Sequence, residues 1–322
     1  MRAMILAAGL GTRLRPLTRA RPKVLVPVMG MPLLDFWIGK LYESGFEAVV
    51  VNAFHLPDKL VKAIHENKWP IPVEVRVEPV LLGTAGGIRN VLDFFGEEPF
   101  VVVNGDIICN VDFQSFYESH LRSGSSVSLL LHDYALFNNV AVNNGFVLGF
   151  ADEARRLNRE QPDVRLLAFT GIHVLEPQVL SDLEQGRPHE IIPAYRNLIE
   201  AGEPPRAYLQ ESLNWREIGS VEAYRAVHAE LAGAPARSFA PLRSGGDISV
   251  HPQAEVSPQA DLRGMVIVGR NSRVEQGAHL EDVIIWDNVT VRQNSRLLNC
   301  IVTDGMEVGG SHENEILCER ND

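Results

Sequence analysis

Apolar residues recur at every sixth position in the C-terminal quarter of this 322-residue chain. The regular positions are Val250, Val256, Leu262, Val268, Val274 and Leu280, and the frame slips near Trp286 before it resumes at Val291 and Leu297. Small residues follow four positions after several of them, namely Ala254, Ala260, Ser272 and Ala278. A period of six fits neither an α-helix nor a simple hairpin, and it is typical of short strands stacked coil upon coil. The repeat predicts a parallel β-helix, with a generic β meander of chance spacing as the alternative.

Up to about residue 230 the chain alternates apolar strands with helical segments. Strands are predicted at 3–8, 48–52, 73–77, 100–103 and 127–131, and helices at 32–44, 57–67, 85–95 and 113–123. Apolar strands separated by helices indicate an α/β fold with a parallel sheet covered on both faces, and ligands of such sheets bind beyond the carboxyl ends of the strands. The predicted domains are a catalytic domain at 1–232, a linker at 233–246, a hexapeptide-repeat β-helix at 247–310 and a loosely held polar tail at 311–322.

A glycine-rich loop after the first predicted strand carries a high density of positive charge. Five cations lie from Arg13 to Lys23 and no acidic residue precedes Asp35, although the whole chain has a formal net charge of −11. Glycines let backbone N–H groups approach an anion, while Arg and Lys side chains neutralise phosphate oxygens. The loop lacks the Walker pattern. It predicts a polyphosphate site, and a solvated cationic surface loop is the alternative.

Composition indicates which kinds of partner the protein binds and in which cellular compartment it works. The acidic balance argues against nucleic-acid binding, which favours a basic face. The three cysteines, Cys109, Cys300 and Cys318, lie too far apart for a metal site or a disulfide framework, which favours a reducing cytoplasm. The N-terminal apolar run is short and precedes cations, so it is predicted as a buried strand rather than a signal peptide, and no run is long enough for a membrane span. We therefore expect a cytoplasmic protein with neither nucleic-acid nor membrane partners.

Seven motifs follow one another along residues 1–232. They are Leu6–Thr18, Pro22–Lys23, Pro27–Leu33, Leu82–Ile88, Val103–Asp106, Thr170–Leu175 and Asn214–Tyr224. With these motifs in this order, residues 1–232 resemble the sugar-1-phosphate nucleotidylyltransferases, also called nucleoside-diphosphate-sugar pyrophosphorylases. The C-terminal repeat is similar to that of mannose-1-phosphate guanylyltransferases, whereas the catalytic half also resembles N-acetylmuramate-1-phosphate uridylyltransferase. The resemblance implies a Rossmann-like domain with a mixed, mostly parallel sheet, followed by a short left-handed parallel β-helix.

The resemblance also implies a reaction of the EC 2.7.7 class, a step of nucleotide-sugar biosynthesis such as supplies cell-envelope polysaccharide. A sugar 1-phosphate attacks the α-phosphorus of a nucleoside triphosphate, and pyrophosphate leaves. Positioning and charge neutralisation then dominate catalysis. By match, Arg13 contacts the β- and γ-phosphates and Lys23 reaches the α-phosphate. The positions matched to nucleotide binding are Leu6, Ala8, Gly9, Gly11, Thr12, Gly83 and Thr84, and those matched to sugar contacts are Thr170 and Gly171.

Asp106 follows an apolar strand and matches the family's Mg²⁺ ligand, since magnesium prefers one or two carboxylates together with substrate phosphates. The second ligand is usually an Asp within a Trp-x-Asp-x-Gly pattern, and Glu217 occupies that position here. We expect coordination to be retained; the alternatives are binding mainly by Asp106 or lost activity. Many relatives carry a Glu-Lys-Pro triplet for the sugar phosphate, which residues 150–159 lack. The replacement for that triplet, the base and the sugar therefore stay open from the sequence.

Two other functions are compatible with the same motifs. One is a non-catalytic regulatory or scaffolding paralogue that binds a nucleotide sugar. The intact Arg13, Lys23 and Asp106 argue against it, whereas Glu217 and the missing Glu-Lys-Pro triplet argue mildly for it. The other is a phosphocholine-type cytidylyltransferase, because some relatives accept non-sugar phosphates. Stacked-strand domains of relatives often self-associate, so we expect a homo-oligomer formed partly through residues 245–310.

Overall fold

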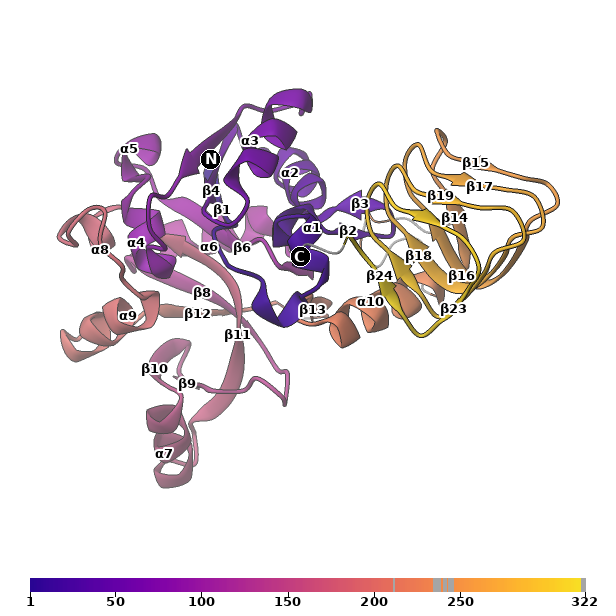
Figure 1. Ribbon diagram of the computed structural model, residues 1–322. Helices are drawn as coiled ribbons and strands as arrows, with labels where there is room; N and C mark the ends of the chain where they lie inside the picture. The colour runs from indigo at the N-terminus through magenta and orange to yellow at the C-terminus, as the bar shows by residue number, and fades with distance from the viewer. Residues whose placement is uncertain (211, 234–238, 240–241, 243–245, 320–322) are drawn as a thin grey trace. The chain divides into compact units, whose positions relative to one another are not determined.

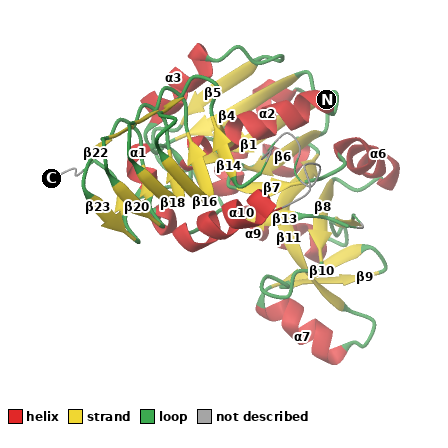
Figure 2. Ribbon diagram, turned by 90° about the vertical axis from the view of Figure 1, so that its right-hand side faces the viewer, coloured by secondary structure: helices red, strands yellow, loops and turns green. Residues whose placement is uncertain are grey.

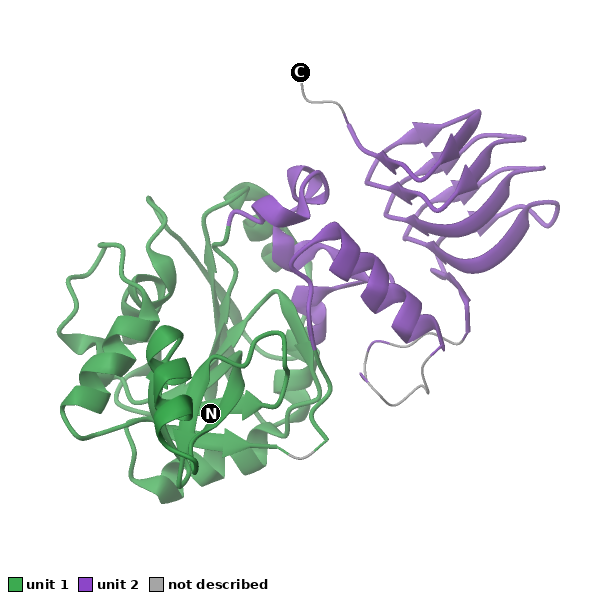
Figure 3. Ribbon diagram, turned by 90° about the horizontal axis from the view of Figure 1, so that it is seen from below, with its two compact units in different colours: residues 1–9, 37–215 green, residues 10–36, 216–322 purple. Residues whose placement is uncertain are grey.

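The computed structural model describes residues 1–210, 212–233, 239, 242 and 246–319. The chain forms two compact units, one of residues 1–9 and 37–215 and the other of residues 10–36 and 216–322 (Figure 3). This grouping does not coincide with the predicted boundary at residue 232, because the segment 10–36 makes its contacts mainly with the C-terminal part of the chain. Most of the predicted linker lies outside the described residues.

The first unit is built on a nine-stranded sheet with the order β5-β4-β1-β6-β11-β8-β12-β10-β9 (Figure 1). The strands are β1 Arg2–Leu6, β4 Ala48–Ala53, β5 Val73–Val77, β6 Phe100–Asn104, β8 Val127–His132, β9 Val140–Asn143, β10 Phe146–Phe150, β11 Arg165–Leu175 and β12 Arg206–Leu209. β5, β4, β1 and β6 are all parallel neighbours, as the alternation of strands and helices predicted. Their carboxyl ends consequently meet at one edge of the sheet.

The rest of the sheet is mixed, which confirms the mixed sheet that the resemblance implied, but antiparallel pairs are too many for it to be mostly parallel, and that part of the prediction was wrong. β11 runs antiparallel to β6 and β8, and β10 runs antiparallel to β9 and β12. β9 and β10 are joined by Asn144 and Gly145, which both have positive φ (49° and 77°). Such a two-residue turn forms a tight hairpin and therefore forces antiparallel pairing. The Asn-Gly pair was the sequence signal for this hairpin.

Helices of the first unit connect the strands and pack on the sheet. Their bounds are α2 Leu33–Glu43, which begins in the second unit, α3 Pro57–Glu66, α4 Gly83–Arg89, α5 Leu92–Phe95, α6 Phe113–Ser123, α7 Asp152–Glu160, α8 Gln178–Ser181 and α9 Ile191–Glu200. The predicted helix at 85–95 is divided into α4 and α5. The predicted helix at 113–123 is confirmed: Asp112 caps it by accepting a hydrogen bond from the Ser115 N–H at 3.0 Å, and Gly124 ends it with φ 65°.

The second unit combines the glycine-loop segment with the C-terminal part of the chain. Its early elements are the 3₁₀ turns η1 Thr12–Leu14 and η2 Lys23–Leu25, the helices α1 Leu17–Ala20 and α10 Val221–Gly233, and the short strands β2 Pro27–Val28 and β3 Met31–Pro32. Two further short strands are β7 Ile107–Cys109, which lies within the first unit, and β13 Trp215–Glu217, which spans the boundary between the units in the sequence.

Short parallel strands fill the C-terminal part of the second unit. They are β14 Ile248–Val250, β15 Glu255–Val256, β16 Asp261–Val268, β17 Arg273–Val274, β18 His279–Ile285, β19 Thr290–Val291, β20 Arg296–Leu298, β21 Ile301–Val302, β22 Glu307–Val308, β23 Ser311–Glu313 and β24 Ile316–Leu317. Figure 2 shows β16, β18, β20 and β23 side by side, in the order of their hydrogen bonding. A second parallel row has the order β15-β17-β19-β22.

The six-residue repeat forms the core of this stack. Val268, Val274, Leu280, Val291 and Leu297 are all buried together. The slip in the repeat is a register shift: Asp261 pairs with His279, eighteen residues on, but Val266 pairs with Val283, only seventeen residues on. One residue fewer in the later coils therefore displaces the frame without moving the buried positions.

The prediction of a loosely held tail from residue 311 was wrong for residues 311–317. β23 pairs with β20, and β24 pairs with β21, both in parallel. The Asn299 side chain donates to Asn314 Oδ1 at 2.6 Å, which joins the last two coils at a corner. These residues are polar because they lie at the end of the stack, and the backbone of the preceding coil supplies their hydrogen bonds. Among the described residues, no helix combines the length and the apolar character needed to cross a membrane.

Candidate active site

Predicted site residues of the first unit gather at the carboxyl ends of its parallel strands. Leu6 ends β1, and its carbonyl accepts a hydrogen bond from the N–H of Gly105 at 3.0 Å. Gly105 and the half-buried Asp106 form the turn after β6. The strand pairing therefore brings Asp106 next to Leu6, at the point where the chain continues into Ala8 and Gly9.

A buried hydrogen-bond chain crosses three strand ends at this edge. The Ala7 N–H donates to Asn52 Oδ1 at 2.7 Å, and Asn52 Nδ2 donates to Glu78 Oε1 at 2.7 Å. Glu78 Oε2 accepts from the N–H of Leu82 at 3.0 Å. Burial raises the pKa of Glu78, and the hydrogen bonds from Leu82 and Asn52 oppose that rise. Sequence reasoning missed Glu78, whose signal was an acid directly between a strand and a glycine-rich turn.

The glycine-rich turn that carries Gly83 and Thr84 is packed too closely for larger residues. Gly83 has φ 68°, and a Cβ there would lie 2.7 Å from the carbonyl oxygen of His189. A Cβ on Gly87 would lie 2.8 Å from Glu78 Oε1. Backbone hydrogen bonds from Gly86 to His189 and from His189 to Leu82 fix the turn from its other side. For Gly86 and Gly87 the structure thus supplies a packing reason.

Thr170 and Gly171 form a bulge in β11, where the pairing with β8 shifts register. Thr170 Oγ1 donates to the Leu130 carbonyl at 2.8 Å, and the Thr170 carbonyl accepts from Trp215 Nε1 at 2.9 Å. Gly171 has φ 82°, and a Cβ there would lie 2.4 Å from Asn104 Nδ2. The bulge therefore supports the strand end that leads to Asp106, and the Thr170 hydroxyl is used within it.

Predicted site residues of the second unit lie on or beside its two 3₁₀ turns, apart from Glu217 on β13. Gly11 has φ 60°, and its carbonyl accepts from Thr18 Oγ1 at 2.8 Å. Thr12 and Arg13 follow on η1, and Lys23 begins η2. Arg13 Nη2 contacts Glu217 Oε1 at 2.6 Å, with side-chain exposures of 67% and 22%. The structure thus pairs two residues that the sequence assigned to different roles.

Oxygen ligands suited to magnesium are present in each unit, namely Asp106 in the first and Glu217 in the second. Within residues 1–210, 212–233 and 246–319, no three His, Cys, Asp or Glu side chains cluster as a ready-made metal site. Magnesium does not require such a cluster, because it keeps waters and substrate phosphates among its ligands. Each carboxylate by itself is therefore of the kind that suits an ion bound together with phosphates.

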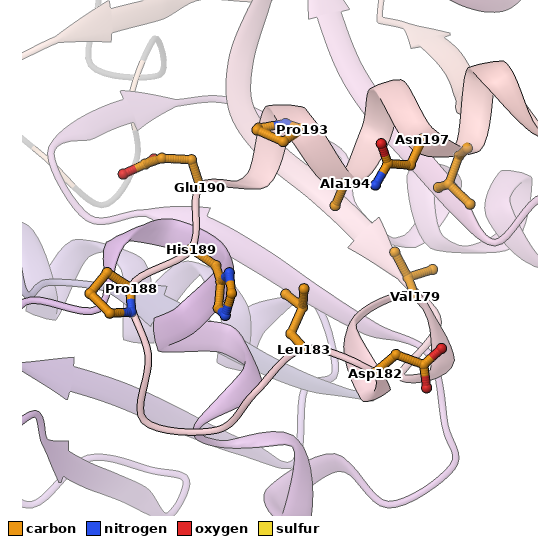
Figure 4. A pocket seen from close by; sticks show the side chains of 10 residues that line it. Val179, Asp182, Leu183, Pro188, His189, Glu190, Pro193, Ala194 and Asn197 are labelled. Atoms are coloured by element: carbon orange, nitrogen blue, oxygen red, sulfur yellow. The ribbon is translucent and has the colours of Figure 1, made fainter.

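A cavity of about 630 Å³ opens beside α8 and α9 in the first unit (Figure 4). Its lining includes Val179, Asp182, Leu183, His189, Glu190 and Asn197, and none of the predicted site residues. His189 also belongs to the segment that packs on the glycine-rich turn. The cavity therefore lies behind the turn rather than at the strand ends that carry Asp106.

Comparison with known proteins decides the family. Residues 2–233 match the sequence family described as nucleotidyl transferase, and residues 244–317 match the GMPPB C-terminal domain. The chain belongs to the nucleotidyl transferase family. The predicted recognition and the EC 2.7.7 enzyme class are thereby confirmed, the relatives being sugar-1-phosphate nucleotidyltransferases. The scaffold and phosphocholine alternatives are not favoured.

Two curated relatives and one solved structure illustrate the likeness. The chain is 29% identical over 303 residues to mannose-1-phosphate guanylyltransferase of Mycobacterium tuberculosis, which covers 90% of this chain and 80% of that protein. It is 32% identical over 250 residues to N-acetylmuramate α-1-phosphate uridylyltransferase of Caulobacter vibrioides, covering 72% and 97% respectively. HddC from Yersinia pseudotuberculosis, complexed with GMP-PN, superposes with a TM-score of 0.58 at 22% identity, covering 70% and 97%, and this supports the fold alone.

Proposed function

We propose that this enzyme joins a nucleoside triphosphate and a sugar 1-phosphate into a nucleoside-diphosphate sugar and pyrophosphate. The observation that carries the proposal is the hydrogen bond from Gly105 to Leu6, which joins the Asp106 turn to the strand that leads into the glycine loop. Nucleotides bind at such strand ends in open α/β sheets. The sugar phosphate oxygen attacks the α-phosphorus directly and is already ionised at neutral pH, so no strong base is required.

Arg13 and Lys23 are proposed to neutralise the triphosphate as the two anions approach each other. Arg13 is paired with Glu217, but its side chain is mostly exposed. Exposed ion pairs stabilise proteins by only about 0–1 kcal/mol. An incoming phosphate can therefore replace Glu217 beside Arg13 at little cost, which would release the Glu217 carboxylate for another ligand.

Mg²⁺ is the proposed cofactor, with Asp106 and Glu217 as its protein ligands. When bound, it would supply positive charge that offsets phosphate repulsion. The protein's own contribution is to orient the carboxylates. Glu217 lies on a short strand and beside Gly219, where a Cβ would lie 2.4 Å from Glu217 Oε1. Because Gly219 has no Cβ, there is room beside it for the longer Glu side chain in place of the usual Asp.

For the substrates we propose GTP and mannose 1-phosphate. Relatives named mannose-1-phosphate guanylyltransferase align with 90% and 96% of this chain, including its C-terminal part. The uridylyltransferase relatives align with 72% and 73%. The resemblance implies that uridylyltransferases tend to lack the Glu-Lys-Pro triplet, as residues 150–159 do, so UTP with N-acetylmuramate 1-phosphate is the second candidate.

A pyrophosphate-release assay tests both the proposed reaction and the proposed substrates. GTP, UTP, dTTP, CTP and ATP are each combined with mannose, glucose and N-acetylmuramate 1-phosphates in the presence of Mg²⁺. We expect the highest kcat/KM for GTP with mannose 1-phosphate. A higher value for UTP with N-acetylmuramate 1-phosphate would contradict the substrate assignment, and no turnover of any pair would contradict the function.

The stacked strands are proposed to form a left-handed β-helix through which the enzyme self-associates in the cytoplasm. The exposed side chains of Ile248 and Val250 on the first strand favour such a contact, since they are apolar and 46% and 40% exposed. The free thiols of Cys109, Cys300 and Cys318 fit a reducing compartment. Light scattering of the full chain and of a chain lacking residues 245–310 is expected to show a loss of oligomer on deletion; a monomer in both would refute it.

A further inference from the structure

Arg21 belongs to the cation-rich segment of the glycine loop, yet it does not face solvent like Arg13. Its side chain is only 15% exposed. Arg21 Nε and Nη2 donate to both oxygens of Asp304 at 2.5 and 2.6 Å, and Nη2 also donates to Asp287 Oδ2 at 2.6 Å. This is the bidentate geometry in which Arg binds a carboxylate most strongly. The Arg21 guanidinium therefore binds carboxylates of the protein rather than a substrate phosphate.

Asp287 and Asp304 occupy the same corner of two successive coils. The Arg270 N–H donates to Asp287 Oδ1 at 2.7 Å, and the Asp287 N–H donates to Asp304 Oδ1 at 3.1 Å. Stacking places two negative charges beside each other, which is unfavourable unless a cation lies between them. Burial alone would lower the pKa of Arg21, but the hydrogen bonds and charges of Asp304 and Asp287 hold it above its ordinary value. Arg21 is thus the counter-ion of the stack.

Further contacts join residues 21–29 to the stack and to α10. Arg21 lies over the Trp286 ring, with 5.4 Å from Cζ to the ring centroid. Trp286 Nε1 donates to the Tyr224 hydroxyl at 3.0 Å, and that hydroxyl donates to the Pro27 carbonyl at 2.7 Å. The Met29 N–H donates to His228 Nε2 at 3.1 Å. Burial lowers the pKa of His228 to about 4, so Nε2 stays an acceptor at neutral pH.

These contacts surround the position assigned to Lys23. Arg21 precedes Lys23 by two residues, and Arg21 Nη1 donates to the Leu25 carbonyl at 3.3 Å, across the 3₁₀ turn that Lys23 begins. The backbone of that turn is therefore held on both sides of Lys23. We propose that Arg21 is a positioning residue, through which the stacked-strand region sets the place of Lys23 and hence the binding of the nucleoside triphosphate.

This proposal rests on the proposed function only in its kinetic part. The uridylyltransferase relative from Caulobacter vibrioides aligns over 250 residues that make up 97% of it, so the family's chemistry does not require a C-terminal stack. In this chain, by contrast, Asp287 and Asp304 of the stack accept hydrogen bonds from Arg21 in the glycine-loop segment. A substitution that breaks the contact between Arg21 and Asp304 should therefore weaken nucleotide binding, although neither residue contacts a substrate.

The test compares Arg21→Met, Asp304→Asn and the double variant in the full-length chain. We expect each single change to lower kcat/KM for the triphosphate at least tenfold, mainly through a higher KM, while KM for the sugar phosphate stays within twofold. The double variant should be no worse than either single one, because both remove the same interaction. Amide hydrogen exchange of residues 21–29 should accelerate in all three. Asp287→Asn, which disturbs only one hydrogen bond to Arg21, is the milder variant should these fail to fold.

The matched control is Arg292→Met, which breaks another ion pair of the stack. Arg292 Nε contacts Glu307 Oε1 at 2.7 Å, and both side chains are more than half exposed. We expect wild-type exchange and kinetics in this variant. Unchanged exchange at residues 21–29 in the Arg21 and Asp304 variants, or an unchanged KM for the triphosphate alongside a lowered Tm, would overturn the proposal. If the wild type turns over no substrate pair, the proposed function fails, while hydrogen exchange still decides whether the contacts of Arg21 with Asp287 and Asp304 hold residues 21–29 in place.

Discussion

Replacing Asp106 by Asn is expected to lower kcat at least 100-fold while changing Tm by less than about 2 °C. The loss is on the order seen when one group that stabilises transition-state charge is removed. Asp106 is half-buried on the turn after β6, so the isosteric amide should keep the turn intact. Pyrophosphate release under saturating substrates and thermal unfolding without ligand measure the two effects.

Asp182→Asn serves as the control for this variant. Asp182 is an exposed acid of the same unit, on the rim of the cavity beside α8, and no predicted site residue lies there. Its kcat should stay within twofold of the wild type. The Mg²⁺ concentration for half-maximal rate should rise in Asp106→Asn alone. A kcat within tenfold of the wild type for Asp106→Asn, at any Mg²⁺ concentration, would remove Asp106 from the metal site.

Replacing Gly171 by Ala is expected to have the largest effect on stability, about 3 kcal/mol, and to lower turnover as well. An Ala at φ 82° is strained, and its Cβ would lie 2.4 Å from Asn104 Nδ2. Asn104 would have to move, together with the turn that carries Asp106. At roughly 2–4 °C per kcal/mol, the expected fall in Tm is about 6–12 °C, as measured by calorimetry.

Gly202→Ala separates backbone strain from the clash. Gly202 has φ 81°, and a Cβ there meets no atom within 4 Å. The control should therefore lose only about 1 kcal/mol and keep its turnover. Equal losses of stability and activity in the two variants would show that the contact with Asn104 does not support the site.

Much of the framework could be predicted because it depends on local patterns. The parallel pairing among β5, β4, β1 and β6 follows from alternating strands and helices, and the buried positions Val268, Val274 and Leu280 follow from their six-residue spacing. The resemblance implied a mixed sheet, but the antiparallel pairing of β9 with β10 was not located, because the hairpin at Asn144-Gly145 was overlooked. The tail was misjudged because polar side chains do not reveal that the backbone of β20 and β21 remained available for pairing.

The roles of Arg13, Lys23 and Asp106 stay predictions that depend on motif order. The buried hydrogen bond between Asn52 and Glu78 was not predicted, because it joins strand ends that are far apart in the chain. No periodicity indicates which buried polar group will find which partner. A buried carboxylate needs hydrogen-bond donors, and only the folded sheet brings them within reach.

The sequence by itself determined the family, the α/β alternation and the repeating strands, since each is carried by the type and spacing of residues along the chain. Only the tertiary structure decided what the cations of the glycine loop do. Arg13 meets Glu217 and stays exposed, whereas Arg21 is buried against Asp287 and Asp304, 266 and 283 residues away. A row of like charges looks uniform in sequence, and the partners are assigned only when stacked coils bring two distant carboxylates to one corner.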